Sequence, residues 1–430
     1  MIKGWEKIEV GQRFSVNPQR QIQRGTVTPF IPMDALLTNA RKFERIDERE
    51  FKGSGQKFIN GDTLIARITP CLENGKTAYV SGLSEGKVGH GSTEYIILTG
   101  IAGISDNLFA YYLVRTPRFR TYAIRRMEGT SGRQRVPAKA VSSYEIDLPP
   151  FAEQKSIASM LGALDDKIEN NQRMNETLEK MARTIFKSWF VDFDPVHAKA
   201  AGNPPAHMDT DIAALFPNSF GNDGLPVGWT HKMLGDFVEI QNGYAFKDWT
   251  EVGVPVVKIG SVKPSIVDLS NSSFVSTEIA EQKENFRLTV GDILIGLTGY
   301  VGEVGRVPQS DIMPMLNQRV GRVLFKNKTF EPYIYTAMRR SEFKSFAESQ
   351  SQGSAQANVS TKQLKNFSLV ATDSALTEKF NRLTRSYFEK ILLNYAESKS
   401  LAELRDVLLP KLMSGEIRVK NAERQVEEAV

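Results

Sequence analysis

Two stretches of this chain carry apolar residues at the spacing of a long amphipathic helix. The first, residues 151–190, contains no proline and a single glycine. Its apolar positions are Ile157, Leu161, Leu164, Ile168, Leu178, Ala182, Ile185 and Trp189. This pattern predicts a helix of about 39 residues, roughly 58 Å long. Asn171 and Asn175 fill the apolar positions between Ile168 and Leu178, and asparagines buried in a helix pair fix its register at some cost in stability.

The second stretch, residues 374–413, has the same character. Its apolar positions are Leu376, Phe380, Leu383, Tyr387, Ile391, Leu401, Leu404, Leu408 and Leu412. We expect Pro410 to kink this helix or to end it, because proline cannot donate a backbone hydrogen bond. Helices of this length need a partner to bury their apolar stripe. Their matched lengths predict that the two pair as an antiparallel coiled coil; the alternative is that each packs only on its own domain.

The remaining sequence predicts two mixed domains and a connection. Residues 1–150 alternate short β-branched runs with Gly-Asp and Asn-Gly turns, which indicates short strands and hairpins followed by a helical patch at 108–126. Residues 229–370 have the same texture. The proline- and glycine-rich connection, 191–228, is expected to be mostly irregular, with one short helix at 212–216. Residues 371–430 hold the second long helix and a tail. The predicted fold class is therefore α+β, with two similar mixed α/β domains.

The chain also repeats itself. Val136, Lys139 and Asn171 recur as Val359, Lys362 and Asn394, each 223 residues later. The stretch "GDTLIARITPCLENGK" (61–76) is answered by "GDILIGLTGYVGEVGR" (291–306), where each Gly-Asp pair is expected to form a tight turn feeding a strand. Two copies of a domain plus a long helix predict a pseudo-twofold arrangement, which suits a protein that reads two half-sites on DNA or holds two copies of a partner.

Composition narrows the function classes. The chain has 430 residues, 55 Lys and Arg against 50 Asp and Glu, and a net charge of +5, which is compatible with nucleic acid without requiring it. Cys71 is the only cysteine, so intramolecular disulfides and cysteine zinc clusters are excluded and a reducing compartment is favoured. No apolar run reaches the length of a membrane span. We therefore expect a cytoplasmic protein.

Catalytic residues are scarce in this sequence. None of the four histidines stands at metal-ligand spacing from another, so neither a metal site nor a cofactor is expected. Asp62, Glu73 and Lys76 superficially resemble a nuclease set, but the Gly-Asp pair is expected to form a tight turn in each copy rather than a catalytic site. We therefore expect no catalytic residues.

Side chains suited to binding nucleic acid are more numerous than catalytic candidates, and they cluster at the same place in both copies. Arginine and lysine neutralise phosphates, whereas arginine, glutamine, asparagine, serine and threonine on a loop can read base edges. The candidates for DNA contact are Arg118, Arg125, Arg126, Thr130, Ser131, Arg133, Arg135 and Lys139 in the first copy, and Arg339, Arg340, Lys344, Ser354, Gln356, Asn358 and Lys362 in the second. One scaffold with different side chains is what an asymmetric two-part target requires.

With these stretches in view, the chain resembles the specificity subunits of type I restriction-modification enzymes over nearly its whole length. The resemblance is carried by "EGTSGRQRVPAKAV" (128–141), by the helical region 146–196, by "LFPNSFGNDGLPVGW" (215–229) and by "LRDVLLPKLMSGEI" (404–417). It implies two target-recognition domains, 1–150 and 229–370, that read a bipartite DNA site. The helices, 151–190 and 371–430, would set the spacer between half-sites, and residues 191–228 would be a linker.

The resemblance further implies that the chain has protein partners and no catalytic activity of its own. Two modification subunits, which methylate adenine using S-adenosylmethionine, would dock on the helices, and ATP-driven restriction subunits would join them. One departure concerns the second copy, which has "VATDSALTEKF" where the first has "LPPFAEQKSI", so its helix is expected to leave its domain at a different angle. Two alternatives stay open: a bivalent coiled-coil adaptor that binds proteins rather than DNA, and an enzyme with cryptic nuclease or methyltransferase activity.

Overall fold

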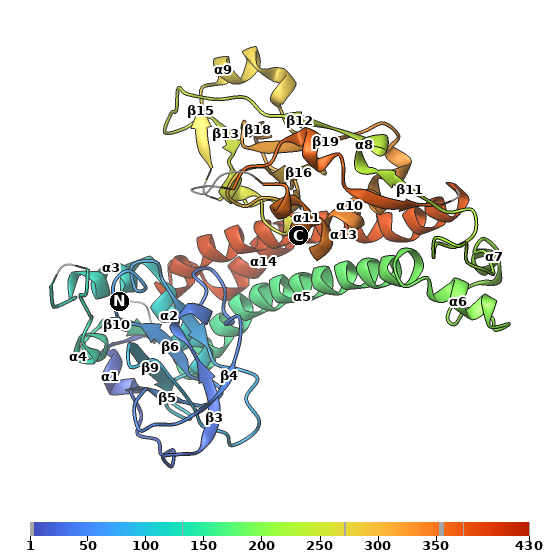
Figure 1. Cartoon of the computed structure of the whole chain (residues 1–430). Coiled ribbons are helices and arrows are strands. Elements are labelled where there is room, and N and C mark those ends of the chain that lie inside the picture. The colour runs from blue at the N-terminus through green and yellow to red at the C-terminus, as the bar shows by residue number, and fades with distance from the viewer. Residues whose placement is uncertain (1–3, 131, 271, 352–356, 373, 430) are drawn as a thin grey trace. The chain divides into compact units, whose positions relative to one another are not determined.

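The structure is a computed structural model that describes all residues except 1–3, 131, 271, 352–356, 373 and 430. The chain forms two compact units (Figure 1). The first unit comprises Met1–Asn170 and Ser398–Val430, and the second comprises Asn171–Glu397. Each unit therefore contains one mixed domain together with a part of both long helices.

The first unit is built on two four-stranded sheets and one two-stranded ribbon. In sheet order, these are β2 (Phe14–Val16), β9 (Tyr95–Gly100), β6 (Thr63–Ala66) and β7 (Thr77–Tyr79); β4 (Asp47–Glu50), β3 (Val27–Ile31), β8 (Gly89–Gly91) and β5 (Lys57–Phe58); and β1 (Glu6–Glu9) with β10 (Glu145–Leu148). Its helices are α1 (Val10–Arg13), η1 (Met33–Ala35), α2 (Asn107–Arg115), α3 (Pro117–Arg125), α4 (Ala138–Ser142), the first half of α5 (Phe151–Phe190), the end of α13 (Ser374–Met413) and α14 (Val419–Ala429).

The main core of this unit joins the first sheet to the helices. Phe109 and Phe119 on α2 and α3 are buried together with Ile157 on α5 and Leu408 on α13. The predicted helical patch at 108–126 is thus two helices, because Thr116 ends α2 and its hydroxyl accepts the Phe119 amide to begin α3. A smaller core joins the two sheets and includes Phe58 of β5 and Tyr95 of β9.

The second unit follows the same plan. Its sheets are, in order, β12 (Val238–Asn242), β19 (Val320–Phe325), β16 (Ile293–Gly296), β17 (Val304–Arg306) and β14 (Ser265–Ile266); β15 (Ser273–Val275), β13 (Val254–Val257) and β18 (Met315–Leu316); and β11 (Thr230–Met233) with β20 (Ser368–Ala371). Its helices are the second half of α5, α6 (Asp194–Ala200), α7 (Thr210–Ala214), α8 (Leu234–Phe237), η2 (Ile259–Ser261), α9 (Thr277–Gln282), η3 (Glu284–Phe286), η4 (Lys328–Phe330), α10 (Glu331–Met338), α11 (Ser341–Ser349), α12 (Thr361–Leu364) and the first half of α13.

The internal repeat predicted from the sequence is confirmed in the two-stranded ribbons and in the main sheets. The ribbon β1-β10 corresponds to β11-β20, and the sheet β2-β9-β6-β7 corresponds to β12-β19-β16-β17. The predicted tight turns are also confirmed. Gly61 and Gly291 have positive φ angles of 91° and 85°, and the carboxylates of Asp62 and Asp292 close the turns by accepting backbone amides. The small second sheets, in contrast, differ in strand number and order.

The antiparallel pairing of the two long helices is also confirmed. In the second unit, Asn171 on α5 donates to Glu397 of α13 (2.8 Å), whereas Phe186, further along α5, packs against the earlier Phe380. The Asn394 side chain donates to Asn175 (2.8 Å). These asparagines are the ones whose positions in the apolar stripe predicted a register-fixing role.

Three local expectations need correction. α13 continues through Pro410 to Met413, so this proline does not end the helix. The connection 191–228 contains α6, which the sequence analysis did not predict, with Pro195 in its first turn, where a missing amide hydrogen costs nothing. The predicted short helix at 212–216 is α7, which begins earlier, at Thr210.

A buried histidine gives the first unit a pH dependence. His90 on β8 is hydrogen bonded through Nδ1 to Thr28 (2.9 Å) and packs against Phe30 and Phe51. Burial, assisted by nearby Arg49, lowers the pKa of His90. The folded state therefore disfavours the proton, so stability is complete above the unfolded pKa of about 6.5 and falls as the pH drops below it. We expect His90→Phe to make the urea midpoint of unfolding less dependent on pH between pH 7 and 5. Substitution of the exposed His207 by Asn should leave the pH dependence of the midpoint unchanged.

Candidate nucleic-acid interface

The polar loop of the first unit, residues 128–135, is anchored at its base and exposed at its tip. Arg135 pairs with Glu128 and with Ile68 through backbone bridges, and the Thr69 amide donates to Gln134 (3.0 Å). The loop is thereby attached to the turn that follows β6. Thr130 and Arg133 at the tip are exposed, and Ser131, another candidate, lies outside the described residues. Anchoring of this kind presents side chains without a buried role, which suits recognition.

The corresponding loop of the second unit is attached in the same way. Asn358 forms a backbone bridge with Thr298 in the turn that follows β16, and the Thr298 hydroxyl donates to the Asn358 side chain (2.9 Å). The Gly299 amide donates to Ala357 (2.8 Å). Ser354 and Gln356, predicted to face bases, lie outside the described residues. The described part shows one loop scaffold used in both units.

The predicted cations divide into ion-paired and unpaired groups. Arg135 forms a bidentate pair with Glu94 (2.8 Å) and Lys344 pairs with Glu303 (2.5 Å). Among the described residues, no carboxylate lies within ion-pair distance of the following exposed cations: Arg118, Arg125, Arg126, Arg133, Lys139 and Lys362. An unpaired arginine or lysine is free to neutralise a phosphate without first losing a partner.

Two of the predicted DNA contacts face the protein interior instead. The Arg339 side chain is only 12% exposed and pairs with Glu179 on α5 (3.2 Å). Arg340 pairs with Glu342, and its guanidinium lies over the ring of Phe186, also on α5. Both arginines therefore hold the second domain against the helix that runs beneath it, and we leave them out of the proposed interface.

Asp62, considered above for a nuclease-like set, has a structural role. Its carboxylate is fully buried and binds Arg20 at 2.5 and 2.8 Å, the Thr99 hydroxyl and the Ile59 amide. Within the described parts of the chain, no group of three or more His, Cys, Asp or Glu residues is arranged to hold a metal ion. None of the helices so described is long and apolar enough to cross a membrane.

The sequence analysis missed the aromatic partners beside these loops. Tyr144, which precedes β10, packs on Tyr122 of α3 (ring centroids 4.7 Å apart). Tyr300, in the turn that holds the second loop, is 57% exposed and has Lys263 over its ring. An alignment of the two copies around α3 and α11 could have found the first pair, because Phe346 and Phe367 form the same contact in the second unit.

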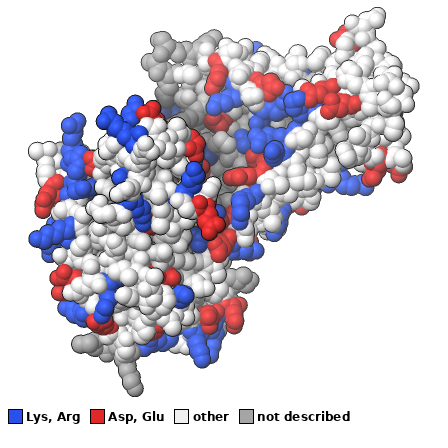
Figure 2. Space-filling view, turned by 90° about the horizontal axis from the view of Figure 1, so that it is seen from below, with Lys and Arg blue, Asp and Glu red and all other residues white. Residues whose placement is uncertain are grey.

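On the face seen in Figure 2, lysine and arginine are interleaved with acidic residues.

The two units repeat one plan, in which a mixed domain carries an anchored polar loop and includes a part of both long helices. The family model described as "Type I restriction modification DNA specificity domain" matches residues 3–180 and 226–370. The chain therefore belongs to the family of type I restriction-modification DNA specificity subunits, as the resemblance in its sequence predicted.

Several characterised relatives are similar over most of the chain. The type I restriction enzyme HindI specificity subunit of Haemophilus influenzae is 26% identical over 432 residues, which cover 89% of this chain and 93% of the relative. The EcoAI specificity subunit of Escherichia coli is 25% identical and covers 84% and 74%. A solved type I restriction-modification S subunit from M. genitalium aligns with a TM-score of 0.55 at 16% identity, over 95% and 96% of the two chains, which shows the shared fold.

Proposed function

We propose that this chain is a non-catalytic specificity subunit that recognises a bipartite, asymmetric DNA site. Residues 1–150 and 229–370 are assigned as target-recognition domains, each for one half-site, and α5 and α13 as the element that sets the spacer. The observation that carries this proposal is the repeated loop scaffold, which is attached to the turn after the corresponding strand in both units, whereas the sequences of the two loops differ. A symmetric target would need no such difference.

The chemistry assigned to each loop follows from its exposed groups. Arg133 and Thr130 in the first unit, and Asn358 in the second, can donate to or accept from base edges in the major groove. The unpaired Lys139 and Lys362, which occupy the same position in the two copies, are suited to phosphates. Phosphate contacts would make binding depend strongly on salt.

The helix pair supplies the proposed docking surface for two modification subunits. Its exposed apolar residues include Met174 and Met181 on α5 and Leu383, Leu393 and Val407 on α13. Leu393 is 64% exposed, which is unusual for a leucine within a long helix and is typical of a surface that a partner covers. Restriction subunits would join the resulting complex, and methylation and cleavage would belong to these partners.

A mobility-shift assay with the modification subunit present tests this function against the adaptor alternative. We expect tight, sequence-specific binding to a two-part site and no methylation or cleavage by the chain alone. Complexes that form with the modification subunit but show no sequence preference would favour the adaptor. Methylation or cleavage by the chain alone would favour the enzyme.

Arg133→Ala should weaken binding to the cognate site by about 1–3 kcal/mol and relax the preference at one position of the first half-site only. The reason is that Arg133 is exposed at the tip of an anchored loop, and an exposed arginine can make a bidentate contact with a guanine edge. Binding to a library randomised in each half-site in turn measures both effects. Arg24→Ala, an exposed arginine of the same unit outside the loop, is the matched control and should keep the original preference.

A further inference from the structure

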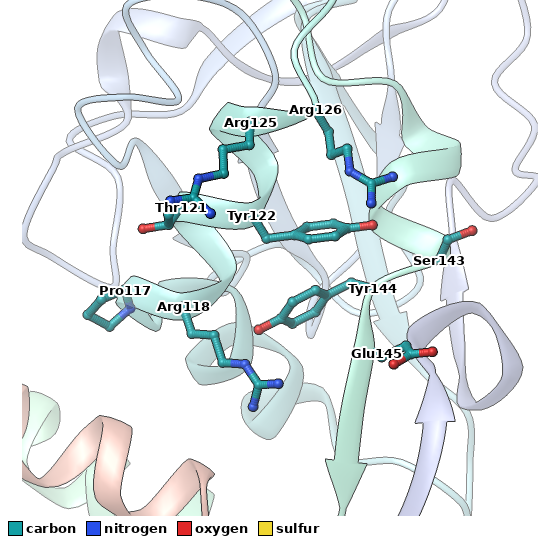
Figure 3. Close-up of a pocket in the computed structure, with 9 residues that line it drawn as sticks. All are labelled: Pro117, Arg118, Thr121, Tyr122, Arg125, Arg126, Ser143, Tyr144 and Glu145. Carbon is teal, nitrogen blue, oxygen red and sulfur yellow. The ribbon is translucent and has the colours of Figure 1, made fainter.

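A cleft in the first unit brings three arginines together around two tyrosines. It has a volume of about 840 Å³ and is lined by α3, by the segment before β10 and by the start of β10. Figure 3 shows the rings of Tyr122 and Tyr144 next to each other, with Arg118, Arg125 and Arg126 around them. The planes of the two rings are tilted by 47°. Nothing in the fold of the recognition domain requires this concentration of charge.

The positive charge of the cleft is not neutralised by the protein. Glu145 is the acidic residue of the lining, and it is already paired with Lys7 (2.8 Å). Within the described part of the chain, Arg118, Arg125 and Arg126 have no ion-pair partner. The exposed Arg45 and Arg49 and the partly exposed Arg13 of the same unit each pair with a carboxylate. Three like charges around one cleft repel one another, and an anion bound between them removes that repulsion.

The second unit provides an internal comparison for this cleft. α3 and α11 correspond residue by residue, with Phe119 and Phe343 buried at the same position. The ring contacts recur: Phe119 and Tyr122 pack on Tyr144, as Phe343 and Phe346 pack on Phe367. The arginines do not recur, since Arg118, Arg125 and Arg126 correspond to Glu342, Ser349 and Gln350. The aromatic contacts are therefore structural, whereas the arginines have another role.

We propose that this cleft binds a backbone phosphate of DNA, and that only the first recognition domain has such a clamp. This inference rests on the proposed function. A phosphate fits better than a base, because Tyr144 is only 5% exposed and the Tyr122 ring already contacts Tyr144 and the Arg126 guanidinium, which lies 5.0 Å from its centroid. α3 leads directly into the polar loop at residue 128, so a duplex that contacts the loop would bring its backbone near the cleft.

The salt dependence of DNA binding tests whether the cleft contacts a DNA phosphate. The full chain with its modification subunit would carry R118Q, R125Q and R126Q together, and the slope of log K against log salt would be measured on the cognate site. We expect the slope to become shallower by about 0.9, because one phosphate contact is lost. The control carries R13Q, R45Q and R49Q, which removes the same net charge from ion-paired arginines and should leave the slope nearly unchanged. The reciprocal variant, E342R with S349R and Q350R, should steepen it.

Each outcome bears on the proposal. Equal slopes for the wild type and the cleft variant, with specific binding intact, would overturn the phosphate clamp and leave the proposed function standing. If wild-type binding shows no salt dependence or no specificity, the proposed function fails and the clamp fails with it. Thermal unfolding in pyrophosphate or ATP distinguishes the source of phosphate. Suppose that pyrophosphate or ATP stabilises the wild type but not the cleft variant, and that the salt slope of DNA binding is the same for both. The cleft would then be assigned to a free phosphate compound, and the DNA assignment would be overturned.

Discussion

Adding one turn to both long helices should abolish binding to the original site and create binding to a site with a longer spacer. The insertion would place four residues after Asn170 in α5 and four after Glu397 in α13, at the limits of the two compact units. Each unit keeps its own helix packing under this change. Four helical residues add about 6 Å, close to two base-pair steps of about 3.4 Å. Binding to the original site should fall to the non-specific level, about 1,000-fold or more weaker.

Selection from a library of sites with randomised spacer length measures the shift. The matched control inserts the same four residues after Gly202, in an exposed turn of the connection between α5 and β11. This control should bind the original spacer, because the helix pair is unaltered. If the variant with two lengthened helices still selects the original spacer, the helices do not set the distance between half-sites.

Arg405→Met should destabilise the first unit by about 3–5 kcal/mol. Arg405 on α13 donates to Asp165 on α5 at 2.6 Å, and both side chains are 4% exposed. Tyr112 of α2 donates to the other carboxylate oxygen of Asp165 (2.6 Å), so the pair ties both long helices to the domain. Removing the guanidinium leaves a buried carboxylate with one neutral donor, which cannot replace the lost charge. Urea unfolding near pH 7, followed by circular dichroism, measures the loss.

The second unit indicates how this loss can be reversed. At the corresponding positions of the repeat it has Phe388 for Asp165 and Ala182 for Arg405, both buried. Replacing both charges, as Asp165→Leu with Arg405→Met, should therefore recover most of the stability, because no unpaired charge remains. Arg45→Met, at an exposed arginine paired with Asp34, is the control and should cost less than about 1 kcal/mol. If the control and Arg405→Met lower the free energy of unfolding by similar amounts, the buried ion pair contributes no more to stability than an exposed one.

The long helices and the repeat were predictable from the sequence because both leave periodic signals. Apolar spacing over a whole helix survives local exceptions, which is why α5 was predicted over its full length. α6 was missed because Pro195 looks like a helix breaker, although at the first turn of a helix it is harmless. Pro410 was expected to kink or end the second helix; it does not end it, because α13 continues to Met413 and is held by packing on both sides of the proline, with Leu408 and Leu412 fully buried.

The candidate site was predictable only as a set of residue types. The sequence placed arginines near both loops but could not show that Arg339 is paired with Glu179, which is 160 residues away in the chain. Pairing between such distant residues depends on how the domain docks against α5, and local pattern carries no record of it. Tyr144 was missed for the same reason, because its partner Tyr122 lies on a different element.

The first compact unit is discontinuous in the chain, and this affects how it is made. Its core needs Leu401, Leu408 and Ala422, which follow the whole second unit in sequence. On the ribosome, the first domain therefore emerges early yet waits with an uncovered apolar face until residues 398–430 are translated. Premature termination within residues 398–430 would leave the core of the first unit incomplete and would not affect the core of the second unit. A truncated product would therefore carry an incompletely folded first domain, although that domain is synthesised before the other.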